Sequence, residues 1–235
     1  MPTFSDSFLT ALGLILRGDA DLIGIVGLSL QVSLSAVALA AVIGVPLGAA
    51  MAVLRFPGRG ALVVLINALM GLPPVVVGLI VYLLFSASGP LGVLGLLYTP
   101  AVMIIAQTIL VTPIIAALTR GALTEMHGEY RETLQVLGAR KLDVIGTLLW
   151  DARFILVTAL LAGLGRALAE VGAVMLVGGN IDHVTRVMTT AIALETSRGA
   201  LPLALGLGMI LLALTLVLNA AVLGLRARLE GPAHA

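Results

Sequence analysis

The sequence predicts an all-α integral membrane protein with five transmembrane helices and one short N-terminal helix that lies along the membrane surface. Hydrophobic residues make up 60% of the 235 residues and charged residues 11%, whereas an average soluble protein has about 25% charged residues. The mean hydropathy is +1.17, and five apolar stretches are long enough to supply the roughly 20 residues that a helix needs to cross a bilayer. This length leaves room for one transmembrane domain, residues 1–235, and for no separate soluble domain.

The N-terminal segment, residues 1–21, has mixed polarity, and its apolar part is too short to cross a bilayer. The apolar run Phe8–Leu16 follows no basic region, so it lacks the pattern of a signal peptide. We expect an interfacial helix that ends at the Arg17-Gly-Asp run.

Five stretches are predicted to span the membrane. They are Leu28–Leu54, Ala61–Ser86, Ala101–Thr119, Phe154–Val177 and Leu201–Leu225. The second contains Pro73 and Pro74, which remove two backbone donors in mid-membrane, so we expect a break whose carbonyl groups need polar partners. Two polar connectors, Arg120–Arg153 and Gly178–Ala200, precede and follow the fourth span.

The chain has 13 Lys+Arg and 12 Asp+Glu residues, and ten of these charged residues lie in the first connector, Arg120–Arg153. A membrane protein that concentrates its charge in one internal loop presents that loop to a partner in water. The apolar spacing predicts a helix over Tyr130–Leu137, a turn at Gly138 and a second, amphipathic helix over Leu142–Trp150. Two such helices form a projection that fits a groove in a partner protein; the alternative is an ordinary solvated loop.

The basic residues predict how the chain is oriented. With five spans, nine Lys and Arg residues lie on one side and three on the other. The nine are Arg55, Arg59, Arg120, Arg131, Arg140, Lys141, Arg153, Arg226 and Arg228, and the three are Arg17, Arg186 and Arg198. Because the side with more Lys and Arg faces the cytoplasm, we expect a multi-pass inner membrane protein with its N-terminus outside, its C-terminus inside and the Arg120–Arg153 loop in the cytoplasm.

Motifs for covalent chemistry do not occur in the sequence. There is no phosphate-binding GxxxxGK run followed by Ser or Thr, no cysteine, and no metal-ligand spacing among the three His residues. We therefore predict no catalytic residue, no metal site and no cofactor in this chain, so an ATP-driven process would need its ATPase on another polypeptide. The net charge of +1 gives no reason to expect a nucleic-acid partner.

Part of the charged loop resembles the EAA loop of ABC-importer permeases. Glu132 is followed six residues later by Gly138 and then by an apolar run, with Leu148 at the position of the family's Ile. The chain departs from the family pattern at two places, with Thr133-Leu134 for the two alanines and Trp150-Asp151 for Leu-Pro.

A downstream run resembles one family more specifically. It consists of Arg166-Ala-Leu-Ala-Glu170-Val-Gly-Ala-Val-Met, then Gly178-Gly-Asn-Ile181, then Thr185-Arg-Val-Met-Thr-Thr-Ala-Ile-Ala-Leu-Glu-Thr196. This run resembles the tungstate branch of the molybdate/tungstate permeases, and the resemblance extends from about Leu28 to the C-terminus.

The resemblance implies a MetI-like core of a type I ABC importer and a homodimer whose translocation path follows the two-fold axis. It also implies two cytoplasmic ATPase subunits, which would bind ATP and Mg, and an external oxyanion-binding protein. The resemblance implies tungstate as cargo before molybdate. Shape does not separate these dianions from each other or from sulfate, so this preference rests on the resemblance alone. The coupling residues would be Glu132, Leu137, Gly138, Ala139, Arg140, Leu142 and Ile145.

Eight polar residues are candidates for the translocation path or its gate: Thr108, Thr112, Arg166, Glu170, Asn180, Arg186, Thr189 and Thr190. Arg166 and Glu170, four residues apart, are expected on one helix face, as a gate or as a structural pair. Thr108 and Thr112 would line the path or form hydrogen bonds between helices. The last four residues would meet the oxyanion or a docked binding protein, or else belong to a solvated connector.

Two other classes of protein remain as alternatives. A secondary transporter or channel that works alone would need an intramembrane ion site or an inverted repeat, and Glu170 is the one acid expected inside a span. A scaffold protein without transport would fit the amphipathic loop but not the proline-broken span.

Overall fold

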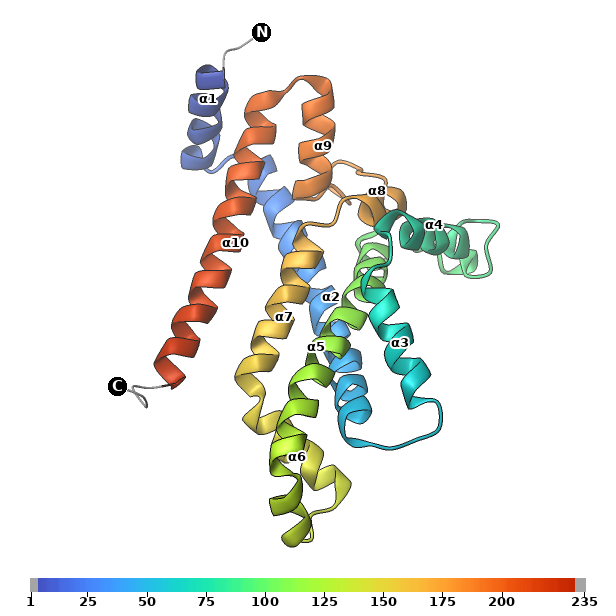
Figure 1. Cartoon of the computed structure of the whole chain (residues 1–235). Coiled ribbons are helices and arrows are strands. Elements are labelled where there is room, and N and C mark those ends of the chain that lie inside the picture. Colours follow the sequence, from blue (N-terminus) through green and yellow to red (C-terminus); the bar gives the residue numbers. More distant parts are fainter. Residues whose placement is uncertain (1–3, 231–235) are drawn as a thin grey trace. The chain divides into compact units, whose positions relative to one another are not determined.

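The computed structural model describes residues 4–230, and this part of the chain is helical with short connections (Figure 1). The helices are α1 (Phe4–Arg17), α2 (Ala20–Val53), α3 (Arg59–Met70), α4 (Pro74–Phe85), the 3₁₀ helix η1 (Gly92–Leu94), α5 (Pro100–Val136), α6 (Lys141–Asp151), α7 (Arg153–Leu168), α8 (Gly172–Gly178), α9 (Met188–Arg198) and α10 (Leu201–Glu230). The predicted all-α class is confirmed. The side chains of residues 135, 222, 223 and 225–230 lie outside the description. This last range includes Arg226 and Arg228, two of the residues on which the predicted orientation rests.

The chain forms two compact units, each assembled from three separate segments. Unit 1 contains Met1–Ala36, Pro73–Gln107 and Ala167–Leu218. Unit 2 contains Val37–Leu72, Thr108–Arg166 and Asn219–Ala235. The long helices α2, α5 and α10 therefore each contribute to both units.

Three helices in the described part are long and apolar enough to cross a membrane: α2, α5 within Pro100–Leu134, and α10 within Leu201–Ala221. Two more crossings arise if each of two bent pairs counts as one span. One pair is α3 with α4, bent by 101°, and the other is α6 with α7, bent by 72°. A total of five spans thus requires both bent pairs to cross.

The proline break predicted at Pro73 and Pro74 is confirmed, because α3 ends at Met70 and α4 starts at Pro74. Pro at the first position of a helix lacks only an N–H that would have no helical partner anyway. The expected span Ala61–Ser86 is therefore divided into two helices of 12 residues each. Neither helix is long enough to cross a bilayer alone.

The predicted start of the first span and the predicted end of the third span were wrong. Helix α2 starts at Ala20, eight residues before Leu28, where the Asp19 carboxylate accepts the Leu22 N–H at 3.1 Å. Helix α5 continues past Thr119 to Val136, because charged side chains on an exposed surface do not stop a helix. The expected helix at Tyr130–Leu137 is therefore the end of α5.

The predicted fourth span, Phe154–Val177, was also wrong as a single helix. Helix α7 ends at Leu168, and the short helix α8 starts at Gly172. Glu170 lies in the break between them, so it does not share a helix face with Arg166 as expected.

Helices α2 and α5 approach closely in unit 2 at Gly48. A Cβ atom built there would lie 2.6 Å from the carbonyl oxygen of Ala116 and 2.7 Å from the Cβ of Thr119. Small residues at such crossings let two backbones pack without a side chain between them.

We expect Gly48→Ala to destabilise the protein, because the new methyl group meets backbone atoms that cannot move aside. Overpacking of this kind costs about 1–3 kcal/mol, which lowers the melting temperature by roughly 2–4 °C per kcal/mol in a protein of this size. Thermal unfolding of the purified protein in detergent measures the change. Gly27→Ala on the same helix is the control, because nothing lies within 4 Å of its Cβ position; equal melting temperatures for both variants would contradict the predicted close packing.

Candidate functional site

The break between α7 and α8 in unit 1 is held by polar side chains. Glu170, only 3% exposed, accepts the Ala173 N–H on its carboxylate at 3.0 Å. Its carbonyl oxygen accepts the Thr189 hydroxyl at 2.7 Å, and the Gln107 amide donates to the Ala167 carbonyl at 3.0 Å. Backbone groups left over at helix ends need such partners when they are buried.

A tight turn, residues 179–187, connects α8 to α9. The buried Thr185 hydroxyl organises it, because its oxygen accepts the Ile181 N–H at 2.9 Å and its proton goes to the Gly178 carbonyl at 2.5 Å. Gly179, Asn180 and His183 have φ values of 70°, 51° and 54°, a region that costs residues with a side chain free energy. The turn is therefore a specified structure and not an arbitrary loop.

The start of α9 is attached to α2 through Ser29. The buried Ser29 hydroxyl accepts the Met188 N–H at 2.7 Å and donates to the Ile25 carbonyl at 2.7 Å. Nearby, a cavity of about 10 Å³ is lined in part by Ser29, Ser33, Gln107 and Thr189. All four are uncharged, and a cavity of this volume has room for about one water molecule.

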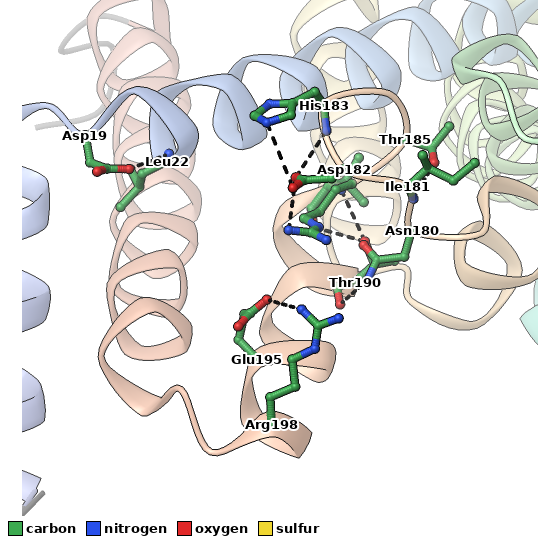
Figure 2. A network of polar contacts seen from close by, with 12 residues as sticks. Asp19, Leu22, Asn180, Ile181, Asp182, His183, Thr185, Thr190, Glu195 and Arg198 are labelled. Atoms are coloured by element: carbon green, nitrogen blue, oxygen red, sulfur yellow. Dashed lines mark hydrogen bonds and ion pairs between the residues drawn. The ribbon is translucent and has the colours of Figure 1, made fainter.

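The charged residues of this hairpin form local ion pairs. The Arg186 guanidinium lies 3.0 Å from the Asp182 carboxylate. This carboxylate also lies 3.9 Å from the His183 ring (Figure 2). Arg198 pairs with the buried Glu195 at 3.4 Å (Figure 2). The positive charge of Arg186 is thus already balanced by a carboxylate.

Tyr98 packs against the same turn. Its N–H donates to the Val177 carbonyl at 3.0 Å, and a Cβ at Gly179 would lie 2.8 Å from its ring. A side-chain hydrogen bond with Tyr82 raises the pKa of the Tyr98 phenol above its usual value. A side chain at position 179 would displace this ring.

In unit 2, the end of α5 and the start of α6 form a sharp turn. Gly138 has φ of +68°, which glycine adopts without a Cβ penalty. The Ala139 N–H returns to the Leu134 carbonyl at 3.0 Å, a hydrogen bond typical of a Schellman helix end. The Asp143 carboxylate then accepts the Arg140 N–H at 3.1 Å, which caps α6.

Helix α6 has one buried face and one exposed face. Val144 and Leu148 are buried in a cluster with residues of α2 and α5, including Ala49 and Leu123. Leu142 is 78% exposed and Trp150 is 69% exposed, and their spacing places them on the same face of the helix. An exposed apolar face of this kind is typical of a surface that binds a partner.

The chain matches the family model described as "Binding-protein-dependent transport system inner membrane component" over residues 44–231. The chain belongs to this family. It is 42% identical over 223 residues to the probable anion ABC transporter permease protein of Haloferax volcanii, covering 92% of this chain and 95% of that protein. It is 38% identical over 226 residues to the tungstate uptake system permease protein TupB of Peptoclostridium acidaminophilum (96% and 99%), and 35% identical over 214 residues to TupB of Campylobacter jejuni (91% and 90%).

Family membership confirms the resemblance to ABC-importer permeases, and the structure shows how the predicted path residues are arranged. Glu170 and Thr189 bond to each other, and Asn180 donates its amide N–H to the Thr190 carbonyl at 3.4 Å. The Thr190 hydroxyl bonds to the Val187 backbone. These four residues therefore support the backbone of one hairpin in unit 1.

The other predicted path residues lie elsewhere. Thr108 and Thr112 are one turn apart on α5, and the Thr112 hydroxyl donates to the Thr108 carbonyl at 2.7 Å. Arg166 lies in the last turn of α7 in unit 2. Arg186 pairs with Asp182, as described above.

The predicted coupling residues gather around the turn between α5 and α6. Glu132, Leu137, Gly138, Arg140 and Leu142 are exposed. Ala139 and Ile145 instead pack partly against the buried cluster of unit 2, so their side chains contribute less to the exposed surface.

Several residues at these sites were not singled out from the sequence. Ser29, Gln107 and Thr185 support the hairpin, and Val136 and Trp150 extend the exposed apolar surface around the turn. The polar residues inside the first and third spans carried a signal, since a buried polar group needs a partner. Which partner each one takes is not visible in the sequence, because the partners are distant in the chain.

We expect Ser29→Ala to loosen the hairpin, because it leaves the buried Met188 N–H without its acceptor. An unsatisfied buried group costs about 1–3 kcal/mol, so amide hydrogen exchange in peptides covering residues 185–198 should become faster. Ser35→Ala removes the same group from the same helix and is the control. If these peptides exchange at the same rate in both variants, Ser29 does not hold α9.

Proposed function

We propose that this chain is the transmembrane subunit of an ATP-driven importer that moves a tetrahedral oxyanion, with tungstate as the preferred cargo, across the inner membrane. One observation carries the proposal: identity of 35% to 42% with anion and tungstate permeases along 91% to 96% of this chain. Similarity over almost the whole length supports a shared architecture as well as a shared function.

We further propose that residues 1–235 act as one transmembrane domain in a homodimer with its path along the two-fold axis. Two ATPase subunits would bind ATP and Mg in the cytoplasm, and an external binding protein would deliver the anion. In this arrangement the N-terminus is outside and the C-terminus inside, and this chain itself holds no catalytic group, metal or cofactor.

The turn between α5 and α6 would be the contact with the ATPase. Leu137 is 74% exposed and Leu142 is 78% exposed, so both can enter an apolar groove, while Glu132 and Arg140 would fix the register. The opposite face of α6 is buried against α2 and α5. A push on α6 would therefore reach the helices of unit 2 through packed side chains.

The hairpin of unit 1 would lie beside the anion path. The support for this is chemical: the polar side chains of Ser29, Ser33, Gln107 and Thr189 are uncharged and lie together, and weak neutral contacts let an anion pass. The cavity they line, about 10 Å³, has room for about one water molecule, so the anion would pass beside the hairpin and not through this cavity. Glu170 and Thr189 would keep the hairpin in place. Arg186 is balanced by Asp182, so a structural role is favoured over a role in attracting the anion. Thr108, Thr112 and Arg166 remain candidates for the path or its gate.

Two alternatives are open to the same tests. The first is a permease whose cargo is molybdate or another oxyanion instead of tungstate, since these dianions share one shape. A secondary transporter of a different class would need an ion-coupling acid, but the buried Glu170 already caps α8 and the buried Glu195 pairs with Arg198.

Element-resolved uptake tests the cargo directly. Cells that lack the chain should accumulate much less tungsten from trace tungstate, and restoring the chain should recover uptake, with molybdenum affected less. Mass spectrometry of washed cells measures both elements. If molybdenum uptake alone is lost and recovered, the assignment shifts to molybdate. If the uptake of neither element changes, import of these oxyanions is refuted.

Substitutions at Gly138 test the coupling role. Gly138→Val should break the turn, because a β-branched residue in the left-handed region costs more than about 1–2 kcal/mol, while Gly138→Asn should keep it since Asn tolerates this region. We expect the Val variant to remain in the membrane but to lose copurification of the ATPase and cargo-stimulated ATP hydrolysis. Nothing lies within 4 Å of the Gly138 Cβ position, so a loss would not arise from a clash inside this chain; full coupling in the Val variant would contradict the assignment.

A further inference from the structure

A cleft in unit 2 is lined almost entirely by basic and apolar side chains. Two adjoining cavities of about 360 Å³ and about 200 Å³ share Val53, Arg55, His127 and Arg131. The turn after α2, the C-terminal part of α5 and the start of α6 form the walls. Lys141 adds a further positive charge in the larger cavity, and Arg59 adds one in the smaller.

The charge of this cleft is one-sided. Four of the chain's 13 Lys+Arg residues line it, and no Asp or Glu is among the lining residues of either cavity. None of the ion pairs found between described residues includes Arg55, Arg131 or Lys141. Like charges brought together repel, so a bound anion would stabilise this arrangement.

Two features prepare the cleft for a ligand. The Arg59 guanidinium is fixed because its Nε donates to the Met51 carbonyl at 2.6 Å. The His127 Nδ1 atom is buried and has no hydrogen-bond partner among the described residues, although buried polar atoms normally have one. Apolar residues Leu134 and Val144 line the larger cavity as well, and low polarity strengthens charge interactions.

We propose that this cleft binds a tetrahedral oxyanion of the phosphate type, as a free ion or as the headgroup of an anionic lipid. Arg guanidinium groups match the oxygen atoms of phosphate in pairs, and Lys supplies a point charge. No Phe, Tyr or Trp lines either cavity, so the cleft offers no ring for stacking a nucleobase. The bound anion would connect the turn after α2 with α5 and the first residue of α6.

This site is separate from the proposed translocation path and does not depend on the cargo. Its expected effect is on the base of α6, because Lys141 is both the first residue of that helix and a wall of the cleft. An anion that holds Lys141 near Arg55 and Arg131 would fix the angle at which α6 leaves the turn.

Binding of inorganic phosphate to the full chain in phosphatidylcholine nanodiscs tests the proposal, without the ATPase and its own phosphate sites. We expect saturable binding that weakens about tenfold or more in the double variant R55Q/R131Q, because a hydrogen bond to a charged group contributes strongly. The control R17Q/R198Q removes the same charge from exposed residues of unit 1. His127→Phe keeps an aromatic ring, removes both nitrogens and should weaken binding about threefold, which keeps the test valid if the double variant unfolds.

A second arm distinguishes the two sources of the anion. Native mass spectrometry compares phosphatidylglycerol retained by the wild type and by R55Q/R131Q, and phosphate binding is repeated in nanodiscs that contain this lipid. Retention by the wild type alone, with phosphate excluded, supports a lipid headgroup; phosphate binding unaffected by the lipid supports a free ion. Absence of both ligands in the wild type, or equal losses in the R17Q/R198Q control, would overturn the proposal.

Discussion

The backbone groups released where α7 ends and α8 begins set the main constraint on unit 1. A broken helix leaves carbonyl and N–H groups without helical partners, and burying them unpaired is costly. Gln107 reaches one carbonyl from α5, Thr189 reaches another from α9, and the Glu170 carboxylate takes an N–H of α8. Three elements distant in the chain are thereby joined at one break. The Ala167 carbonyl also accepts the Glu170 N–H at 3.2 Å, so Gln107 adds a second bond there and ties α5 to the break.

This constraint changes how polar residues in such a protein are best interpreted. A Thr or Glu inside an apolar stretch suggests a contact with the cargo, yet here Glu170, Thr189 and Thr190 each bond to the backbone of the hairpin. A residue that holds irregular backbone is positioned by the same bonds that make it unavailable for strong ligand binding. A path bordered by such residues is shaped by the fold and offers only weak contacts, which suits an ion that must leave again.

The sequence predicted best those features that depend on neighbours in the chain. The turn at Gly138 follows from the intolerance of other residues for the left-handed region, and the break at Pro73 and Pro74 follows from their missing donors. Hydropathy could not show that Phe154–Val177 is two helices, because an apolar segment with a three-residue break has the same composition as a continuous one. The end of α5 was missed for the opposite reason: charge begins at Arg120, but the helix does not depend on burial there.

The two units differ in how their charged groups are compensated. In unit 1 the guanidinium groups of Arg186 and Arg198 face carboxylates of their own hairpin, so the positive charges of this hairpin are balanced locally. In unit 2 the basic residues around His127 line a cleft that contains no acid among its lining residues. Since clustered positive charge is unfavourable without a counter-ion, unit 2 is suited to meeting anionic ligands or partners, whereas unit 1 is suited to holding irregular backbone in an apolar surrounding. The turn between α5 and α6 and the hairpin between α8 and α9 are therefore held differently: the first beside a cluster of basic side chains, the second by ion pairs and hydrogen bonds to its own backbone.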